Sequence, residues 1–257
     1  MLQQQIREDS SQLMNLIHSG STHNIELALQ LAKSQDIRLD ISKYKTIYNW
    51  LDYLVKGSNI NRPKTMLREL FDLEILDLSL SQKQRIPTSI GLLSNLRILI
   101  LSLNNVASLP KQINQLTQLE SLHLDYNKLQ KLPVKFQQLK QLKTLKLSNN
   151  RIQKFPIQVL SISSLEHLNL ADNQIQIIPT KISSLYNLKT LNLNNNPIKE
   201  LPQSIFHLTQ LEQLILPLQL AKKGFIPKLI KELPSCTIQF GAQFHKSPKL
   251  NRDRVFL

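Results

Sequence analysis

The side chains that could do chemistry are few, and the most suggestive are two histidines and an aspartate. His123 and Asp125 are two positions apart, and His167 follows later in the chain. Imidazole and carboxylate groups are ordinary zinc ligands, so a metal site is the first hypothesis to test. In the repeat architecture that the sequence predicts, the histidines are two strands apart, roughly 10 Å. That separation is too large for one ion about 2 Å from each nitrogen. We therefore interpret both as surface histidines and expect no metal or other cofactor.

The sequence also lacks the motifs of the common enzyme classes. It contains neither a G-x-S-x-G nucleophile elbow nor an H-E-x-x-H zinc motif. Its five glycines are isolated rather than clustered into a phosphate-binding loop. Cys236, the only cysteine, stands beside a strand-like segment and is expected to pack rather than to act as a nucleophile. We therefore expect no enzymatic activity, no catalytic residue and no small-molecule substrate.

The chain is organised by a strict repeat of 23 residues. Each unit reads LxxLxLxxNxLxxLPxxIxxLxxL, and its first leucine recurs without slippage at Leu73, Leu96, Leu119, Leu142, Leu165, Leu188 and Leu211. The first half alternates like a β-strand, and the second half has the spacing of a helical or 3₁₀ turn. Successive strands should stack in parallel with the bulkier second halves on the other side, so we expect the strands on the concave face of a solenoid.

Two further columns of the repeat are expected to be structural. Asparagines stand where the chain leaves each strand, and a buried amide there can pair with backbone groups of the turns on both sides. They are Asn104, Asn127, Asn150, Asn173 and Asn196. Prolines at the start of each return half fix φ. They are Pro87, Pro110, Pro133, Pro156, Pro179 and Pro202.

This unit resembles the leucine-rich repeat, and specifically its 23-residue intracellular subtype. Plant intracellular Ras-group proteins, the animal Ras-pathway scaffold and many bacterial proteins use that subtype. The resemblance covers about residues 64–227. It implies an α/β solenoid, a right-handed horseshoe with a parallel β-sheet on its concave face and a helical N-terminal cap. It further implies a non-enzymatic scaffold that binds proteins, from a bacterium or another intracellular source.

Three regions are expected along the chain. Residues 1–62 form the helical cap, residues 63–227 carry about seven repeats, and residues 228–257 form a C-terminal cap and a basic tail. In the first region one helix should end at Gly20, a second should be capped by Asn24, and a third should span residues 42–55. Ile37, Leu39 and Ile41 alternate like a short strand. The alternation of Cys236, Ile238 and Phe240 predicts a last strand.

A protein partner is expected on the concave face, where side chains between and just after the inward leucines are exposed. The residues that we predict to bind it are Ile98, Ile100, Ser121, His123, Asp125, Tyr126, Thr144, Lys146, His167, Asn169, Asp172, Asn192 and Asn194. On the first two strands Ile75, Ile98, Ile100 and Leu103 form an apolar patch. Such a patch can mark an interface. It can equally be covered by the N-terminal helices, or reflect the preference of β-branched residues for strands.

The positive charge needs its own explanation. The formal net charge is +14 and the isoelectric point about 9.9. Lys146 is the only basic residue of the concave columns, and Tyr126 the only aromatic one, whereas nucleic-acid binding favours a basic groove with aromatic platforms. We therefore interpret the charge as a solubilising surface and consider nucleic acid an improbable partner. The alternative is an electrostatic binder of nucleic acid or of an anionic membrane surface through the basic edge and tail.

The compartment is predicted from three absences. A single cysteine provides no disulfide framework. The segment MLQQQIREDSSQLMNLI lacks the pattern of a signal peptide. No uninterrupted apolar run approaches the roughly 18 residues of a membrane span. We expect a cytoplasmic, monomeric signalling scaffold.

Overall fold

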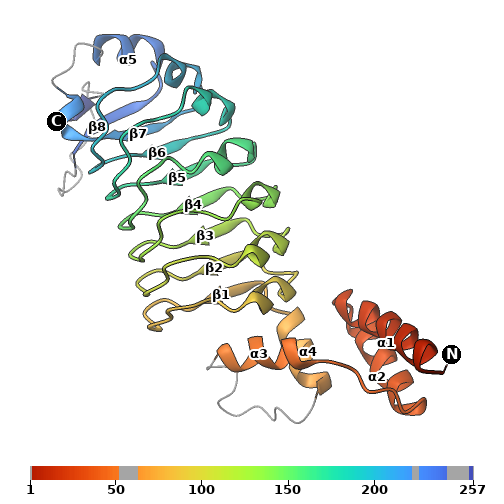
Figure 1. The fold of residues 1–257 in the computed structure, drawn as a ribbon. Coiled ribbons are helices and arrows are strands. Elements are labelled where there is room, and N and C mark those ends of the chain that lie inside the picture. Colours follow the sequence, from red (N-terminus) through yellow and green to blue (C-terminus); the bar gives the residue numbers. More distant parts are fainter. Residues whose placement is uncertain (1, 52–62, 222–225, 242–254, 257) are drawn as a thin grey trace, which may run out of the picture.

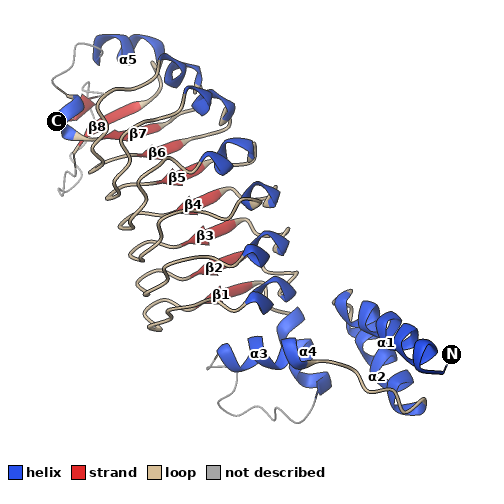
Figure 2. Cartoon of the chain, in the orientation of Figure 1, coloured by secondary structure: helices blue, strands red, loops and turns tan. Residues whose placement is uncertain are grey.

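A parallel β-sheet forms the body of the protein (Figures 1 and 2). It has nine strands among the residues that the structure describes. The computed structural model describes residues 2–51, 63–221, 226–241 and 255–256. The strands follow one another in chain order as β1 Ile75–Asp77, β2 Ile98–Ile100, β3 Ser121–His123, β4 Thr144–Lys146, β5 His167–Asn169, β6 Thr190–Asn192, β7 Gln213–Leu216, β8 Thr237–Phe240 and β9 Val255–Phe256. Register partners from β1 to β7 occupy equivalent positions of successive repeats, as Leu122 and Leu145 do. The predicted α/β solenoid is confirmed.

Short 3₁₀ helices form the return half of the repeats. They are η1 Thr88–Leu92, η2 Lys111–Gln115, η3 Phe136–Gln138, η4 Ile157–Ser161, η5 Thr180–Ser184 and η6 Gln203–His207. A further 3₁₀ helix, η7 Leu218–Leu220, follows β7 directly. Pro110 and Pro202 precede their helices with φ of −67° and −68°, the value that the proline ring imposes. The 3₁₀ helices occupy one side of the solenoid and the strands the other (Figure 2). The strand side, which the sequence predicts to be concave, is called the concave face from here on.

Helices lie at the β1 end of the solenoid (Figure 1), four of them in the described part of residues 2–71. They are α1 Leu2–His18, α2 Thr22–Ser34, α3 Ser42–Trp50 and α4 Pro63–Phe71. Helix α3 contacts η1, and α4 contacts both α2 and α3. The Trp50 indole donates to the carbonyl of Arg85 at 3.1 Å, and the Asn95 amide donates to the carbonyl of Phe71 at 2.9 Å. Because Leu67 of α4 is fully buried, this packing covers the apolar end that a terminal repeat would otherwise expose.

Two local predictions for the N-terminal region are wrong. Helix α2 begins at Thr22 after Ser21, so Asn24 lies inside the helix, and its amide donates to the Ser19 hydroxyl at 3.0 Å instead of capping. Residues 37–41 form no strand, because their apolar side chains pack against the core without a neighbouring strand to pair with. Helix α3 ends at Trp50. The predicted continuation to residue 55 lies outside the described residues, as does most of the tail.

At the C-terminal end the predicted last strand is confirmed as β8. It pairs in parallel with β7, and β9 pairs with β8. Helix α5 Ile226–Glu232 lies between β7 and β8, where the seventh return segment would be. Cys236, Ile238 and Phe240 are buried. Burial raises the pKa of the Cys236 thiol to about 11, which agrees with a packed cysteine rather than a nucleophile.

The asparagine column makes the same four hydrogen bonds in each full repeat. The Asn127 amide nitrogen donates to the carbonyls of Leu101, Leu124 and Asp125 at 2.8, 3.1 and 3.2 Å. Its amide oxygen accepts from the backbone N–H of Val106 at 2.9 Å. Each asparagine therefore joins its own corner to the corner of the preceding repeat. The same pattern occurs at Asn104, Asn150, Asn173 and Asn196.

Replacing Asn150 by alanine should lower the free energy of unfolding by on the order of 1–3 kcal/mol, because three carbonyls and one N–H lose their buried partner. Asn194→Ala is the matched control. Asn194 is equally buried, but its side-chain oxygen has no partner among the described residues, so we expect little change or a small gain. Urea unfolding followed by circular dichroism checks both, and equal losses would contradict the role of the ladder.

Candidate protein-binding face

The concave face is built from alternate residues of the short strands. In β2 to β6 the central leucine is buried while the residues before and after it are half-buried. This alternation and the turn after each strand place twelve of the thirteen predicted binding residues on the concave face with part of their side chains exposed. Asn194 differs, because it is only 4% exposed and offers a partner almost nothing of its side chain. We therefore remove it from the predicted site.

The first two strands present an open apolar patch. Ile75 is 60% exposed and Leu103 47%, while Ile98 and Ile100 are half-buried. Leu80, beside them, is 71% exposed. Helix α3 packs against η1 on the return side. The described parts of the N-terminal helices therefore leave the patch accessible. This favours the hypothesis that the patch is an interface over the hypothesis that these helices cover it.

The middle of the face is polar, and its side chains form hydrogen bonds both within a strand and between neighbouring repeats. The Ser121 hydroxyl lies 2.9 Å from Nε2 of His123. The Asp125 carboxylate accepts from both the backbone N–H and the hydroxyl of Ser148, at 2.9 and 2.6 Å. Desolvation, helped by the nearby Lys146 ammonium, lowers the pKa of His123 below its usual 6.5, and the charge of Asp125 opposes this shift only in part.

A hydrogen-bond donor row crosses strands β4 to β6. Lys146, Asn169 and Asn192 are register partners on successive strands. Each asparagine oxygen accepts from a backbone N–H two residues later, at 3.1 and 3.0 Å, so the amide nitrogens remain as donors on the concave side. Next to this row, Nδ1 of His167 lies 3.0 Å from the Thr190 hydroxyl. These residues line a shallow hollow of about 200 Å³.

Residues at the corner after each strand have a left-handed backbone. This column has φ between 50° and 57° and contains Leu80, Leu103, Tyr126, Asn149, Asp172 and Asn195. Asparagine and aspartate tolerate this region, whereas leucine and tyrosine are strained in it. Tyr126 is 54% exposed, so the core does not require its bulk. Strained residues tend to lie at functional sites, which adds weight to Tyr126 as a binding residue.

Tyr126→Asn should raise the free energy of unfolding by about 1 kcal/mol, because asparagine adopts a positive φ at lower cost than tyrosine. Thermal unfolding measures the change. Tyr126→Phe is the control, since it keeps the strained backbone and should leave the melting temperature unchanged. If the asparagine variant were no more stable than the phenylalanine variant, backbone strain at this corner would be negligible.

The lowered pKa of His123 gives a stability prediction with a defined sign. The unfolded chain binds a proton to this side chain near pH 6.5 and the folded chain only at lower pH, so stability falls as pH decreases from about 6.5 through the folded pKa. His123→Gln should therefore reduce the loss of melting temperature between pH 7 and pH 5. His207→Gln, at an exposed position of η6, is the control. An unchanged loss in His123→Gln would contradict the prediction.

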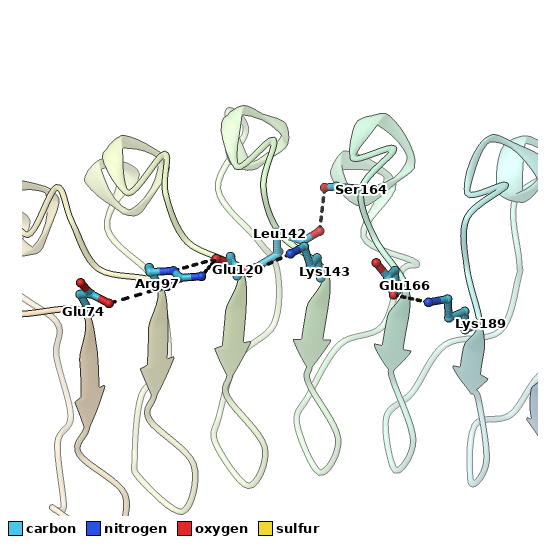
Figure 3. Close-up of polar contacts among 8 residues, drawn as sticks. All are labelled: Glu74, Arg97, Glu120, Leu142, Lys143, Ser164, Glu166 and Lys189. Atoms are coloured by element: carbon cyan, nitrogen blue, oxygen red, sulfur yellow. Dashed lines mark hydrogen bonds and ion pairs between the residues drawn. The ribbon is translucent and has the colours of Figure 1, made fainter.

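A charge ladder at the start of the strands was not anticipated from the sequence. Its residues are Glu74, Arg97, Glu120, Lys143, Glu166, Lys189 and Glu212, one per repeat and alternating in sign. Glu120 lies 2.5 Å from Arg97 and 2.8 Å from Lys143, and Glu166 lies 2.7 Å from Lys189 (Figure 3). Hydrogen bonds from Lys143 and Arg97 lower the pKa of Glu120.

The sequence contains the signal for this ladder, because the residue after the first leucine of each repeat is charged. It is easily overlooked, since charges on exposed positions are common. Residues of the ladder line an open hollow of about 280 Å³ together with Ile75, Ile98, Ser121 and Thr144. One edge of the concave face is therefore bordered by charges of both signs.

The arrangement does not suggest a metal site. His123 and His167 lie on β3 and β5, separated by β4. Within the described part of the chain, no group of three histidine, cysteine or acidic side chains could hold a metal ion. In the same residues, no helix has the length and apolar character needed to cross a bilayer.

Family models agree with this architecture. A model described as "Leucine rich repeat" matches residues 94–152 and 117–175, and a second, described as "Leucine Rich repeats (2 copies)", matches residues 163–207. No curated protein sequence matches the chain. The repeats within residues 94–207 therefore match leucine-rich repeats.

Solved structures share the fold. A leucine-rich-repeat protein of Leptospira interrogans is 32% identical with a TM-score of 0.60, and the match covers 69% of this chain and 44% of that one. An internalin of Listeria monocytogenes is 25% identical with a TM-score of 0.58, covering 70% and 51%. The functional domain of InlJ from Listeria monocytogenes, 25% identical with a TM-score of 0.55, covers 73% and 38%. It includes a cysteine ladder, which a chain with one cysteine cannot form. The chain spans about half or less of these structures.

Proposed function

We propose that the concave face binds a protein partner and that the protein is a non-enzymatic scaffold. One observation carries the proposal. The inward positions of the strands are almost all leucine, whereas the exposed positions beside them change from repeat to repeat, as in Ser121, Thr144 and His167. A rigid sheet with varied exposed side chains suits recognition, and leucine-rich repeats typically act in protein–protein interaction and typically lack catalysis.

The face is chemically divided, which indicates the kind of partner. Aliphatic side chains of β1, β2 and the corners after them would contact an apolar part of the partner, and their burial would supply much of the affinity. The donor row of Lys146, Asn169 and Asn192 suits carbonyl or carboxylate groups. A partner with an apolar segment followed by a polar, acceptor-rich segment would match both parts. Small molecules fit less well, because the hollows are shallow and open.

The proposal extends to the setting of the protein. A strict 23-residue period and a single cysteine are typical of the intracellular subtype of the repeat, and they support a cytoplasmic signalling scaffold. We include in this proposal a bacterial or similar source and a monomeric state. The division into a cap of residues 1–62, an array of residues 63–227 and a C-terminal part of residues 228–257 belongs to it as well.

Simultaneous alanine substitution of His123, Tyr126, Lys146 and His167 tests the proposal. We expect partner capture from a cell extract to fall at least about tenfold, since truncating a single hot-spot side chain costs about 2 kcal/mol or more and tyrosine is enriched at such positions. The fold should persist, because all four are partly or fully exposed. A matched variant alters Lys111, Gln176, Lys181 and His207, which are exposed outside the strands. Undiminished capture by the concave variant, or equal loss in both, would show that the partner binds elsewhere.

A further inference from the structure

A long stretch within repeats three and four carries only positive charge. Between Asp125 and Glu166 the sequence has seven lysines and one arginine and no acidic residue. Lys143 belongs to the charge ladder, where it pairs with Glu120 at 2.8 Å. Lys146 lies on β4 in the concave face. The remaining cations of the stretch lie on the turns and return halves, and Lys131, Lys135 and Lys154 are exposed there. A local excess of positive charge therefore lies outside the concave face.

Aliphatic side chains protrude among these lysines. Val134 is 81% exposed, Ile157 64% and Ile177 76%, the largest values among the large hydrophobic side chains of repeats three to five. Val134 and Ile157 occupy the same position in neighbouring repeats, and Ile177 occupies the position that Lys154 has one repeat earlier. The repeat does not require apolar residues there, because the counterparts of Val134 elsewhere are polar: Thr88, Lys111, Thr180 and Gln203.

The two kinds of side chain share one surface. Lys131, Lys154 and Ile157 line a single open cleft of about 380 Å³. Its lining also includes Leu132 and Phe155, which are otherwise buried in the core. The lysine–aliphatic surface is defined by Lys131, Val134, Lys135, Lys154, Ile157 and Ile177. It combines an apolar centre with ammonium groups on flexible stems.

We propose that the lysine–aliphatic surface docks on an anionic lipid membrane. Lysine ammonium groups next to a bilayer are attracted by the negative headgroups. Aliphatic side chains without polar atoms gain by entering the boundary between headgroups and acyl chains, and the lysine stems can extend beside them to keep the charges at the headgroup level. The mixture of exposed aliphatic and basic residues fits that boundary better than it fits water.

Nucleic acid matches the same surface less well. Bases of single strands are held mainly by stacking on aromatic side chains. The six residues of the surface include no aromatic side chain, and Phe155 beneath them is buried. Membrane docking is independent of the proposed partner, because the surface lies on the return half and leaves the concave strands free. The protein could then hold its partner at a membrane.

Vesicle sedimentation tests the inference with the full-length chain. Wild-type protein should bind phosphatidylcholine vesicles that contain about 30% phosphatidylserine, should not bind pure phosphatidylcholine vesicles, and should bind more weakly as salt rises. The variant K131Q/K135Q/K154Q should bind at least about tenfold more weakly. The variant V134S/I157S/I177S should also lose about tenfold, since the aliphatic side chains would no longer enter the lipid.

Two matched variants distinguish binding through this surface from a general effect of net charge or of exposed apolar side chains. K33Q/K43Q/K45Q removes the same charge from exposed positions of the N-terminal helices, and I75S/L80S/L103S removes three exposed aliphatic side chains from the concave side. Both should bind the vesicles as wild type does. The inference fails if the wild-type protein does not bind the anionic vesicles or if V134S/I157S/I177S binds them as well as wild type does. It also fails if either control variant weakens binding as much as the corresponding variant of the lysine–aliphatic surface. Binding to a single-stranded oligonucleotide but not to vesicles would assign the surface to nucleic acid instead.

Discussion

The side-chain amide of the repeated asparagine is the interaction on which the rest of this structure depends. Each repeat must turn sharply after only three or four strand residues, and the corner leaves backbone carbonyls and N–H groups without strand or helix partners. Asn127 and its counterparts pair with three carbonyls and one N–H, partly in their own corner and partly in the preceding one. A corner closed in this way can be stacked on an identical corner, so the repeat length and the register are coupled.

Because the register is fixed, every position of the repeat becomes a row that runs along the solenoid. Leucines form the buried rows, and the exposed rows can differ in chemistry without affecting the fold. The charge ladder shows how such a row is kept compatible with close stacking. Neighbouring members alternate in sign, so like charges never adjoin. Exposed pairs such as Lys143 with Glu120 add little stability. Their alternation avoids the repulsion that a row of one sign would cause.

Because the side chains of the exposed rows can vary without affecting the fold, one array of repeats can carry two unrelated surfaces. The concave face combines an apolar patch near β1 with polar rows from β3 to β6. The lysine–aliphatic surface lies on return halves of the middle repeats, where the repeat demands only that Leu132, Phe155 and Ile178 face inward. In the concave corners, Tyr126 places a bulky exposed side chain on a left-handed backbone that asparagine adopts at lower cost.

Periodicity in the sequence determined the solenoid, the inward leucines, the role of the corner asparagines and the last strand, because contacts between equivalent positions repeat with the chain. It also determined which residues stand on the concave face, with the exception of Asn194. Only the tertiary structure decided that Asn194 is buried, that α2 starts before Asn24, and that the described helices leave the apolar patch open. Exposure at such positions depends on what packs over them, and no local pattern encodes that. The left-handed backbone of the corners was also decided by the tertiary structure. Leucine and tyrosine do not favour a positive φ, so the identities of Leu103 and Tyr126 did not predict the value that the stacked repeats impose.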